Sequence, residues 1–115
     1  MEIVDLADAS DSRREQAAEL LVDHFDQPGG WPEMEAARAE VAQVLSNGFA
    51  RAAVETGLLL GWIGGLPQYH GRVWELHPIL VRRDLRRRGV GRALVQVFEG
   101  EAVKARRSDP HAWDR

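Results

Sequence analysis

Residues 73–99 read VWELHPILVRRDLRRRGVGRALVQVFE, and they carry the clearest structural pattern in the chain. Val73–Val81 is apolar and β-prone, which is typical of a strand. The arginine-rich segment Arg82–Arg88 follows and is expected to form a turn. From Gly89 onward, apolar residues recur at spacings of three and four, which predicts one face of a helix; these residues are Val90, Ala93, Leu94, Val97 and Phe98.

Two glycines lie where the predicted strand gives way to the helix. The first N–H groups of a helix have no internal partner, and the helix dipole adds partial positive charge there. Gly89 and Gly91 carry no side chain to block an approaching group, so this end can hold a phosphate or pyrophosphate. Formal charge comes from Arg82, Arg83, Arg86, Arg87, Arg88 and Arg92. The alternatives for such a cluster are a solvated turn or a nucleic-acid contact.

The pattern R-x-x-G-x-G at residues 86–91 resembles the acetyl-CoA-binding motif of the GNAT family of N-acetyltransferases. That family places the motif between a central strand and a long helix, as this sequence does. The preceding ELHPIL, residues 75–80, narrows the match, because a Glu-x-His-Pro strand is similar to the aminoglycoside 6′-N-acetyltransferases of that superfamily. The resemblance covers roughly residues 31–103 and is sharp in residues 74–94.

The resemblance implies a cofactor site along the strand and the start of the helix. Pro78 has no N–H, so it predicts a bulge or a sheet edge. In the family, a bulge here frees backbone groups that bind the pantetheine arm and polarise the thioester carbonyl, which is a large catalytic contribution. The expected acetyl-CoA ligands are Ile79, Leu80, Val81, Arg86, Arg87, Arg88, Gly89, Val90, Gly91 and Arg92.

Two titratable residues on the strand are candidates for the general base. Alternate side chains of a strand share a face, so Glu75 and His77 are expected to point the same way, about 7 Å apart. A carboxylate or an imidazole can take the proton that an attacking amine loses. The resemblance implies that both residues contact the substrate amine. The alternative is that Glu75 pairs with a nearby arginine and His77 is an ordinary strand residue.

The remaining parts of the site are less defined. Trp31 and Glu33 lie where family members build the lip of the acceptor pocket, although Trp31 can equally staple a helix to the sheet. The general acid that protonates the leaving thiolate is in the family a tyrosine from a later helix. Tyr69, which precedes the central strand, is not assigned that role. The histidines show no metal-ligand spacing with carboxylates, so no metal is expected.

Composition limits the function classes. The chain has 115 residues, which predicts a single domain, and a formal net charge of −3 with a pI near 5.8, which argues against general nucleic-acid binding. It has no cysteine, so disulfides and a cysteine nucleophile are excluded. No apolar signal segment or run of about 20 apolar residues is present, and a cytoplasmic protein is expected.

The predicted order of elements is β-α-α-β-β-β-α. It implies an α/β (α+β) fold, a GNAT-like mixed sheet flanked by helices and truncated after the acetyl-CoA-binding helix. The domain is predicted to span residues 1–105, with a polar tail at 106–115. The expected elements are strands at 2–7, 49–55, 58–66 and 73–81, and helices from about Ser10 to Phe25, from Trp31 to Asn47 and from Gly89 to about Lys104.

The preferred function is acetyl-CoA-dependent N-acetylation of a cationic amine, which the resemblance narrows to an aminoglycoside 6′-amino group and hence to antibiotic resistance. The alternative is a truncated, non-catalytic module that binds CoA or a partner chain. A nucleic-acid contact through residues 82–92 is the third possibility. The strand at 73–81 is expected to be an exposed edge, so a homodimer or completion of the sheet by another chain is expected.

Overall fold

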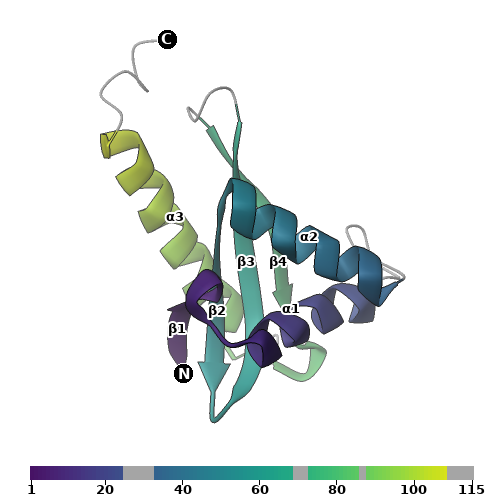
Figure 1. Ribbon diagram of the computed structural model, residues 1–115. Helices are drawn as coiled ribbons and strands as arrows, with labels where there is room; N and C mark the ends of the chain where they lie inside the picture. Colours follow the sequence, from purple (N-terminus) through teal and green to yellow (C-terminus); the bar gives the residue numbers. More distant parts are fainter. Residues whose placement is uncertain (25–32, 69–72, 86–87, 109–115) are drawn as a thin grey trace.

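The computed structural model describes residues 1–24, 33–68, 73–85 and 88–108, and for residues 67–68, 73–77 and 105–108 the backbone alone (Figure 1). The predicted order of helices and strands is confirmed, with two short 3₁₀ turns added. The elements are β1 (Glu2–Asp5), η1 (Leu6–Asp8), α1 (Asp11–Asp23), α2 (Met34–Asn47), β2 (Phe49–Glu55), β3 (Leu58–Gln68), β4 (Val73–Val81), η2 (Arg83–Leu85) and α3 (Val90–Ser108).

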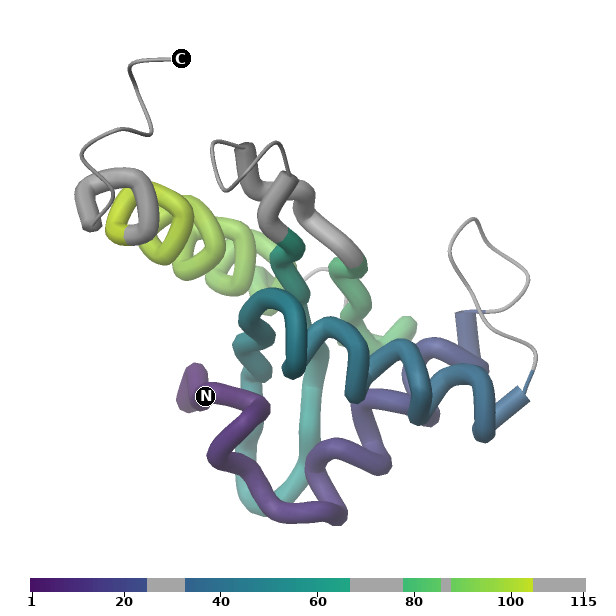
Figure 2. The backbone as a smooth tube through the Cα atoms, turned by 45° about the horizontal axis from the view of Figure 1, so that its top comes forward, coloured from purple at the N-terminus to yellow at the C-terminus, as the bar shows by residue number. Residues whose placement is uncertain are grey.

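The strands form one sheet in the order β1-β2-β3-β4, and each neighbouring pair is antiparallel. β4 is therefore an edge of the sheet that the structure describes. Helices α1 and α2 cover one face of this sheet, and α3 runs across the other face (Figures 1 and 2). The result is a three-layer α/β arrangement, in agreement with the predicted fold class.

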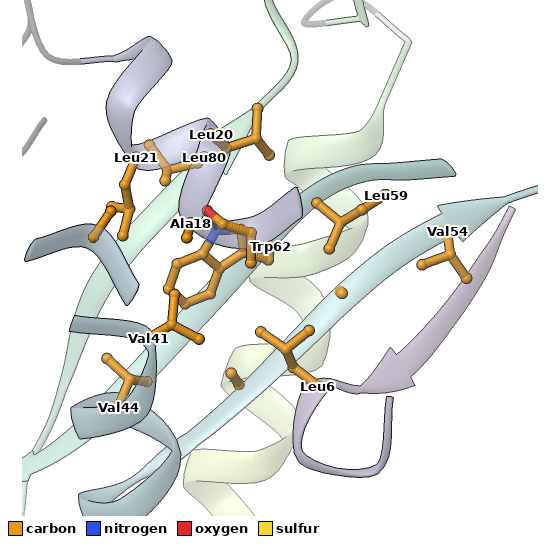
Figure 3. Packing of buried hydrophobic residues seen from close by; sticks show 14 residues of the cluster. Leu6, Ala18, Leu20, Leu21, Val41, Val44, Val54, Leu59, Trp62 and Leu80 are labelled. Atoms are coloured by element: carbon orange, nitrogen blue, oxygen red, sulfur yellow. Dashed lines mark hydrogen bonds between the residues drawn. The ribbon is translucent and has the colours of Figure 1, made fainter. Parts of the chain in front are cut away.

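The layer between the sheet and helices α1 and α2 is built around Trp62. Its side chain is fully buried, and its indole Nε1 donates a hydrogen bond of 3.0 Å to the backbone oxygen of Ala17 (Figure 3). Apolar residues of both helices are buried here; they include Ala17, Leu20, Leu21, Ala37, Val41 and Val44. Phe25, the predicted end of the first helix, lies outside the described residues.

The layer on the other face holds α3 against the sheet. Val90, Leu94 and Phe98 pack with buried residues of β2, β3 and the turn after β4. Gly65 makes this close approach possible, because a Cβ atom there would lie 2.8 Å from ring atoms of Phe49 and Phe98. The start of α3 is thus fixed by apolar contacts on the sheet.

The first half of the chain differs from the prediction at several element ends. β1 ends at Asp5, not at Ala7, because the Asp5 carboxylate accepts a 3.0 Å hydrogen bond from the Ala7 N–H and so caps η1. Helix α1 is capped by Ser10, at the predicted start of the helix, and ends two residues before Phe25. Helix α2 begins at Met34. The predicted start at Trp31 lies outside the described residues.

The second half agrees more closely. The boundaries of β2 and β4 are as predicted, and the hairpin turn is formed by Thr56 and Gly57, which have φ values of 46° and 81°. Positive φ at both positions is the geometry whose twist suits a two-residue hairpin. β3 continues to Gln68, two residues further than predicted, and α3 continues to Ser108, beyond Lys104.

Candidate active site

β4 contains a bulge at the proline. In the register between β3 and β4, Ile63 lies opposite Ile79 and Gly65 lies opposite Leu76. Two residues of β4, His77 and Pro78, therefore lie across from a single residue of β3. Since proline cannot donate to the ladder, the pairing shifts at this point. The predicted bulge is confirmed, and it comes directly before the part of β4 that was expected to bind the cofactor.

The backbone beyond the bulge presents polar groups to the open edge of the sheet. The Arg82 N–H donates a 2.9 Å hydrogen bond to the Leu60 oxygen on β3. Because neighbouring residues of an antiparallel strand point their N–H and C=O groups in opposite directions, Leu80 also faces β3. Ile79 and Val81 then direct their backbone groups to the edge. Both residues are among the acetyl-CoA ligands that the family resemblance implied.

The first two arginines after β4 are bonded to the framework. The Arg82 Nε donates to the Leu59 oxygen at 2.6 Å, and its Nη2 donates to Gln16 Oε1 at 3.3 Å. Gln16 Oε1 also accepts from the Leu59 N–H at 2.9 Å. Arg83 Nη2 donates to the backbone oxygen of Asp23 at 2.6 Å. These bonds join the end of β4 to β3 and to helix α1.

The turn after β4 ends at Gly89, the residue that directly precedes α3. The Arg88 N–H donates to the Leu85 oxygen at 3.1 Å, and the Ala93 N–H donates to the Gly89 oxygen at 3.1 Å, which is the first helical bond. Gly89 has a φ of 79°, a left-handed conformation that glycine adopts without steric cost. Val90, only 2% exposed, anchors the first turn of the helix in the core.

The space around the helix start is open. Among the described residues, a Cβ atom on Gly89 would have no heavy atom within 4 Å, and one on Gly91 would meet only Val81 Cγ2, at 3.7 Å. Arg88 and Arg92 are exposed beside these glycines. The free N–H groups of a first helical turn, with the helix dipole behind them, form an anion-binding site of the kind used for phosphates.

An open groove of about 680 Å³ lies between the end of α1 and the turn after β4. It is lined by Leu20, Val22, Asp23, His24, Arg82, Arg83 and Asp84. His24 is buried, and its Nδ1 lies 2.8 Å from the Leu20 oxygen. The groove therefore places a histidine from the first helix beside the arginine-rich turn.

The model of the acetyltransferase (GNAT) family matches residues 14–109, which include the bulged strand, the turn and the glycine-led helix. The chain belongs to the GNAT family. No curated protein matches it. The family resemblance predicted from residues 75–91 is confirmed.

Solved structures with the same fold include three aminoglycoside N-acetyltransferases. One is an aminoglycoside 6′-N-acetyltransferase complexed with coenzyme A, with a TM-score of 0.79. Another, from Enterococcus faecium, and a third, described as type Ii, each have a TM-score of 0.76. Each is 30% identical to this chain and covers 91% of it, while the chain spans 57%, 57% and 66% of their lengths.

The structure describes some of the predicted site residues of this GNAT chain fully, others only by their backbone, and others not at all. Glu75 lies opposite Leu66 in the register of β4, and His77 lies in the bulge, but the side chains of both are outside the described part. Glu33 is exposed at the start of α2. Trp31, Arg86 and Arg87 are outside the described residues. Those that the structure brings together are Ile79, Val81, Arg88, Gly89, Val90, Gly91 and Arg92. Leu80 instead pairs with Trp62 of β3, and its side chain is buried in the layer under α1 and α2.

Sequence reasoning missed the residues that hold this region in place. Gln16 and Arg82 are bonded although 66 positions separate them, and Asp23 and Arg83 are 60 positions apart. No periodicity or motif links such pairs, so only the packing of α1 on the sheet brings them together. His24 entered the prediction solely as a residue without metal-ligand spacing.

The part of the chain that the structure describes contains no group of three or more histidine, cysteine, aspartate or glutamate residues that could hold a metal ion. Within the same residues, no helix has the length and apolar character that crossing a membrane requires.

Proposed function

We propose that this GNAT chain binds acetyl-CoA along the open edge of β4 and at the start of α3, and that it transfers the acetyl group to an amine. One observation carries the proposal. The outward-facing backbone of Ile79 and Val81 leads, through a turn fixed by Arg82, directly to the open helix start at Gly89 and Gly91. An extended amide arm and its pyrophosphate need a run of backbone groups followed by an anion site, in this order.

The reaction needs no covalent intermediate on the enzyme. The amine nitrogen attacks the thioester carbonyl carbon, and the oxygen that becomes negative accepts hydrogen bonds from N–H groups at the edge near Ile79. The carbon–sulfur bond then breaks and CoA leaves as a thiolate. Glu75 or His77, directly or through one water, takes the proton that the amine loses, and a proton from solvent or from an acid converts the thiolate to a thiol.

The proposed acceptor is the 6′-amino group of an aminoglycoside. Support comes from the three similar structures, whose names state this activity for those proteins at 30% identity. Acetylation removes one positive charge from the antibiotic, so resistance would be the consequence for a cell that makes this protein.

A second candidate function is favoured by the edge of the described sheet. β4 pairs with β3 on one side, and the groups of Ile79 and Val81 on its other side can pair with a strand of another chain. In that case the chain would be a non-catalytic module that binds CoA or a partner, or a homodimer whose subunits complete each other's sheets.

Thermal unfolding with and without acetyl-CoA tests the proposal. A ligand that binds only the folded state adds roughly 2.7 kcal/mol at about 100 times its dissociation constant, which raises the midpoint of a domain of this size by several degrees. We expect that rise, followed by acetyl transfer to an aminoglycoside in a thiol-release assay. A rise without transfer would favour the non-catalytic module, and no rise would contradict the cofactor site.

The same assay tests the base. We expect Glu75→Gln and His77→Ala to lower kcat while leaving the midpoint shift by acetyl-CoA in place. The unfolding midpoint of each variant without ligand is the control, because it shows whether the substitution has disturbed folding. Wild-type rates in both variants would show that neither residue is the base.

A further inference from the structure

The two ring nitrogens of His24 differ: one is hydrogen-bonded within the described part of the protein, and the other is not. Its Nδ1 lies 2.8 Å from the backbone oxygen of Leu20. A carbonyl oxygen can only accept a hydrogen bond, so Nδ1 carries the proton. In the neutral imidazole the second nitrogen, Nε2, then has a lone pair and acts as an acceptor. The packing of the helix end therefore sets the tautomer of this residue.

The acceptor nitrogen is buried without a donor. His24 is 4% exposed, and its Nε2 has no hydrogen-bond partner among the residues that the structure describes. A buried polar atom without a partner is costly, and a bound water, ion or ligand can supply the missing hydrogen bond. His24 is one of the residues that line the groove at the end of α1, so a ligand in that groove lies next to this histidine.

The groove favours a neutral ligand. Among the described residues that line it, the charged ones are Arg82, Arg83, Asp23 and Asp84, and their formal charges cancel. Val22, which is partly exposed, adds an apolar surface. An uncharged segment with both N–H and C=O groups matches this lining better than a phosphate or an ammonium group does.

The position of the groove connects it to the proposed cofactor site. Arg82–Asp84 follows Val81 directly, and Val81 presents its backbone to the open edge of β4. A chain of atoms that leaves this edge for the start of α3 passes the residues of the turn that line the groove. The pantetheine arm of CoA is such a chain, and it carries two secondary amides.

We propose that His24 Nε2 accepts a hydrogen bond from an amide N–H of the pantetheine arm of acetyl-CoA, and that His24 is thereby a cofactor-binding residue supplied by α1. This inference rests on the proposed function. It assigns the groove to the uncharged arm and leaves the pyrophosphate to the helix start at Gly89 and Gly91.

Binding measurements on the full chain test this assignment. His24→Phe keeps a planar ring and removes the acceptor, and His24→Gln keeps an amide oxygen near the position of Nε2. The probes are acetyl-CoA, pantetheine and adenosine 3′,5′-bisphosphate, with affinities from titration calorimetry. Since one hydrogen bond is at stake, we expect His24→Phe to weaken acetyl-CoA and pantetheine about 5- to 10-fold. Adenosine bisphosphate should bind unchanged, and His24→Gln should recover part of the loss.

Other outcomes overturn the inference in distinguishable ways. Equal losses for all three probes would show that His24 serves only the structure of the helix end. Unchanged affinity for acetyl-CoA and pantetheine would show that the groove does not hold the arm, while the proposed function would stand. A loss confined to an added aminoglycoside, kanamycin, would assign the groove to the acceptor amine. A wild-type chain that binds none of the cofactor probes would contradict the proposed function as well.

Discussion

The two ends of the arginine-rich segment behave differently although they share one residue type. Arg82 and Arg83, which directly follow β4, donate hydrogen bonds of 2.6 to 3.3 Å to oxygens of β3 and α1. Arg88 and Arg92, after that turn, are exposed beside the glycines that begin α3. The first pair belongs to the framework, and the second pair faces the space where a phosphate is proposed to bind.

The difference shows that an arginine cluster is not a single electrostatic patch. The guanidinium group has five donors in a fixed fork, so one side chain can join several backbone and side-chain oxygens. Arg82 does this because β3 passes on one side of it and Gln16 on the other. Exposed arginines near a helix start instead add charge that acts on a ligand. Substitutions can therefore separate the two roles.

The largest expected effect is on stability, from Arg82→Met. This change removes charge-assisted hydrogen bonds to the Leu59 oxygen and to Gln16 while keeping a long apolar stem. We expect the free energy of unfolding to fall by about 2–3 kcal/mol. Arg88→Met is the matched control, and its effect should stay within about 0.5 kcal/mol. Urea titration of both variants measures the difference. Equal losses of unfolding free energy in the two variants would show that Arg82 and Arg88 do not have different roles.

The next effect is on cofactor affinity, from Gly91→Asp. A carboxylate in the first helical turn suits the helix dipole, so folding should be retained, but it repels phosphate and occupies the open space. We expect acetyl-CoA to bind about 30-fold more weakly. Gly100→Asp, on the same helix and also in open space, is the control. If Gly91→Asp left the midpoint shift by acetyl-CoA unchanged, the phosphate would have to bind elsewhere.

A smaller loss of affinity is expected when the exposed arginines are neutralised. Arg88→Gln and Arg92→Gln should each weaken acetyl-CoA binding about 3- to 5-fold, since exposed ion pairs contribute up to about 1 kcal/mol. The effect should shrink as salt is raised, because exposed charges are screened. Lys104→Gln makes the same charge change near the other end of α3 and should leave affinity unaltered. A loss that did not depend on salt would mean that these residues act through structure.

The smallest effect concerns the ion pair that joins α1 to α2, away from the turn. Arg38 donates to Glu15 Oε1 at 2.6 Å and to Oε2 at 2.9 Å, and these hydrogen bonds hold the pKa of Glu15 below its ordinary value of 4.5. A lowered carboxyl pKa contributes stability above the ordinary value, and the contribution disappears as the pH falls through the lowered value.

Glu15→Gln should therefore reduce the unfolding midpoint slightly at neutral pH, and the gap to the wild-type chain should close below the ordinary pKa of glutamate. Because both side chains are exposed, we expect a small difference that scanning calorimetry across this pH range can resolve. Acetyl-CoA affinity should not change. A gap that persisted in acid would show that packing, rather than charge, links the two helices here.

The local structure of the candidate site could be predicted well from sequence. The β-prone run Val73–Val81, the bulge at Pro78 and the helix that starts after Gly89 follow from neighbours within a few positions. Each depends on backbone properties of the residues themselves: a missing N–H in proline, a positive φ in glycine, a 3.6-residue apolar repeat. Element ends such as Asp5 and Ser108 were predicted less well, because a single capping bond or added turn shifts them.

By itself, the sequence determined the order of the elements, the strand, turn and helix of residues 73–99, and the GNAT family. Only the tertiary structure decided which way the edge of β4 faces, since the direction of the Ile79 and Val81 groups depends on the register with β3. It also decided which arginines are anchored and that His24 is buried beside them. The physical reason is distance along the chain: bonds between residues 16 and 82 or 23 and 83 exist only after α1 packs on the sheet.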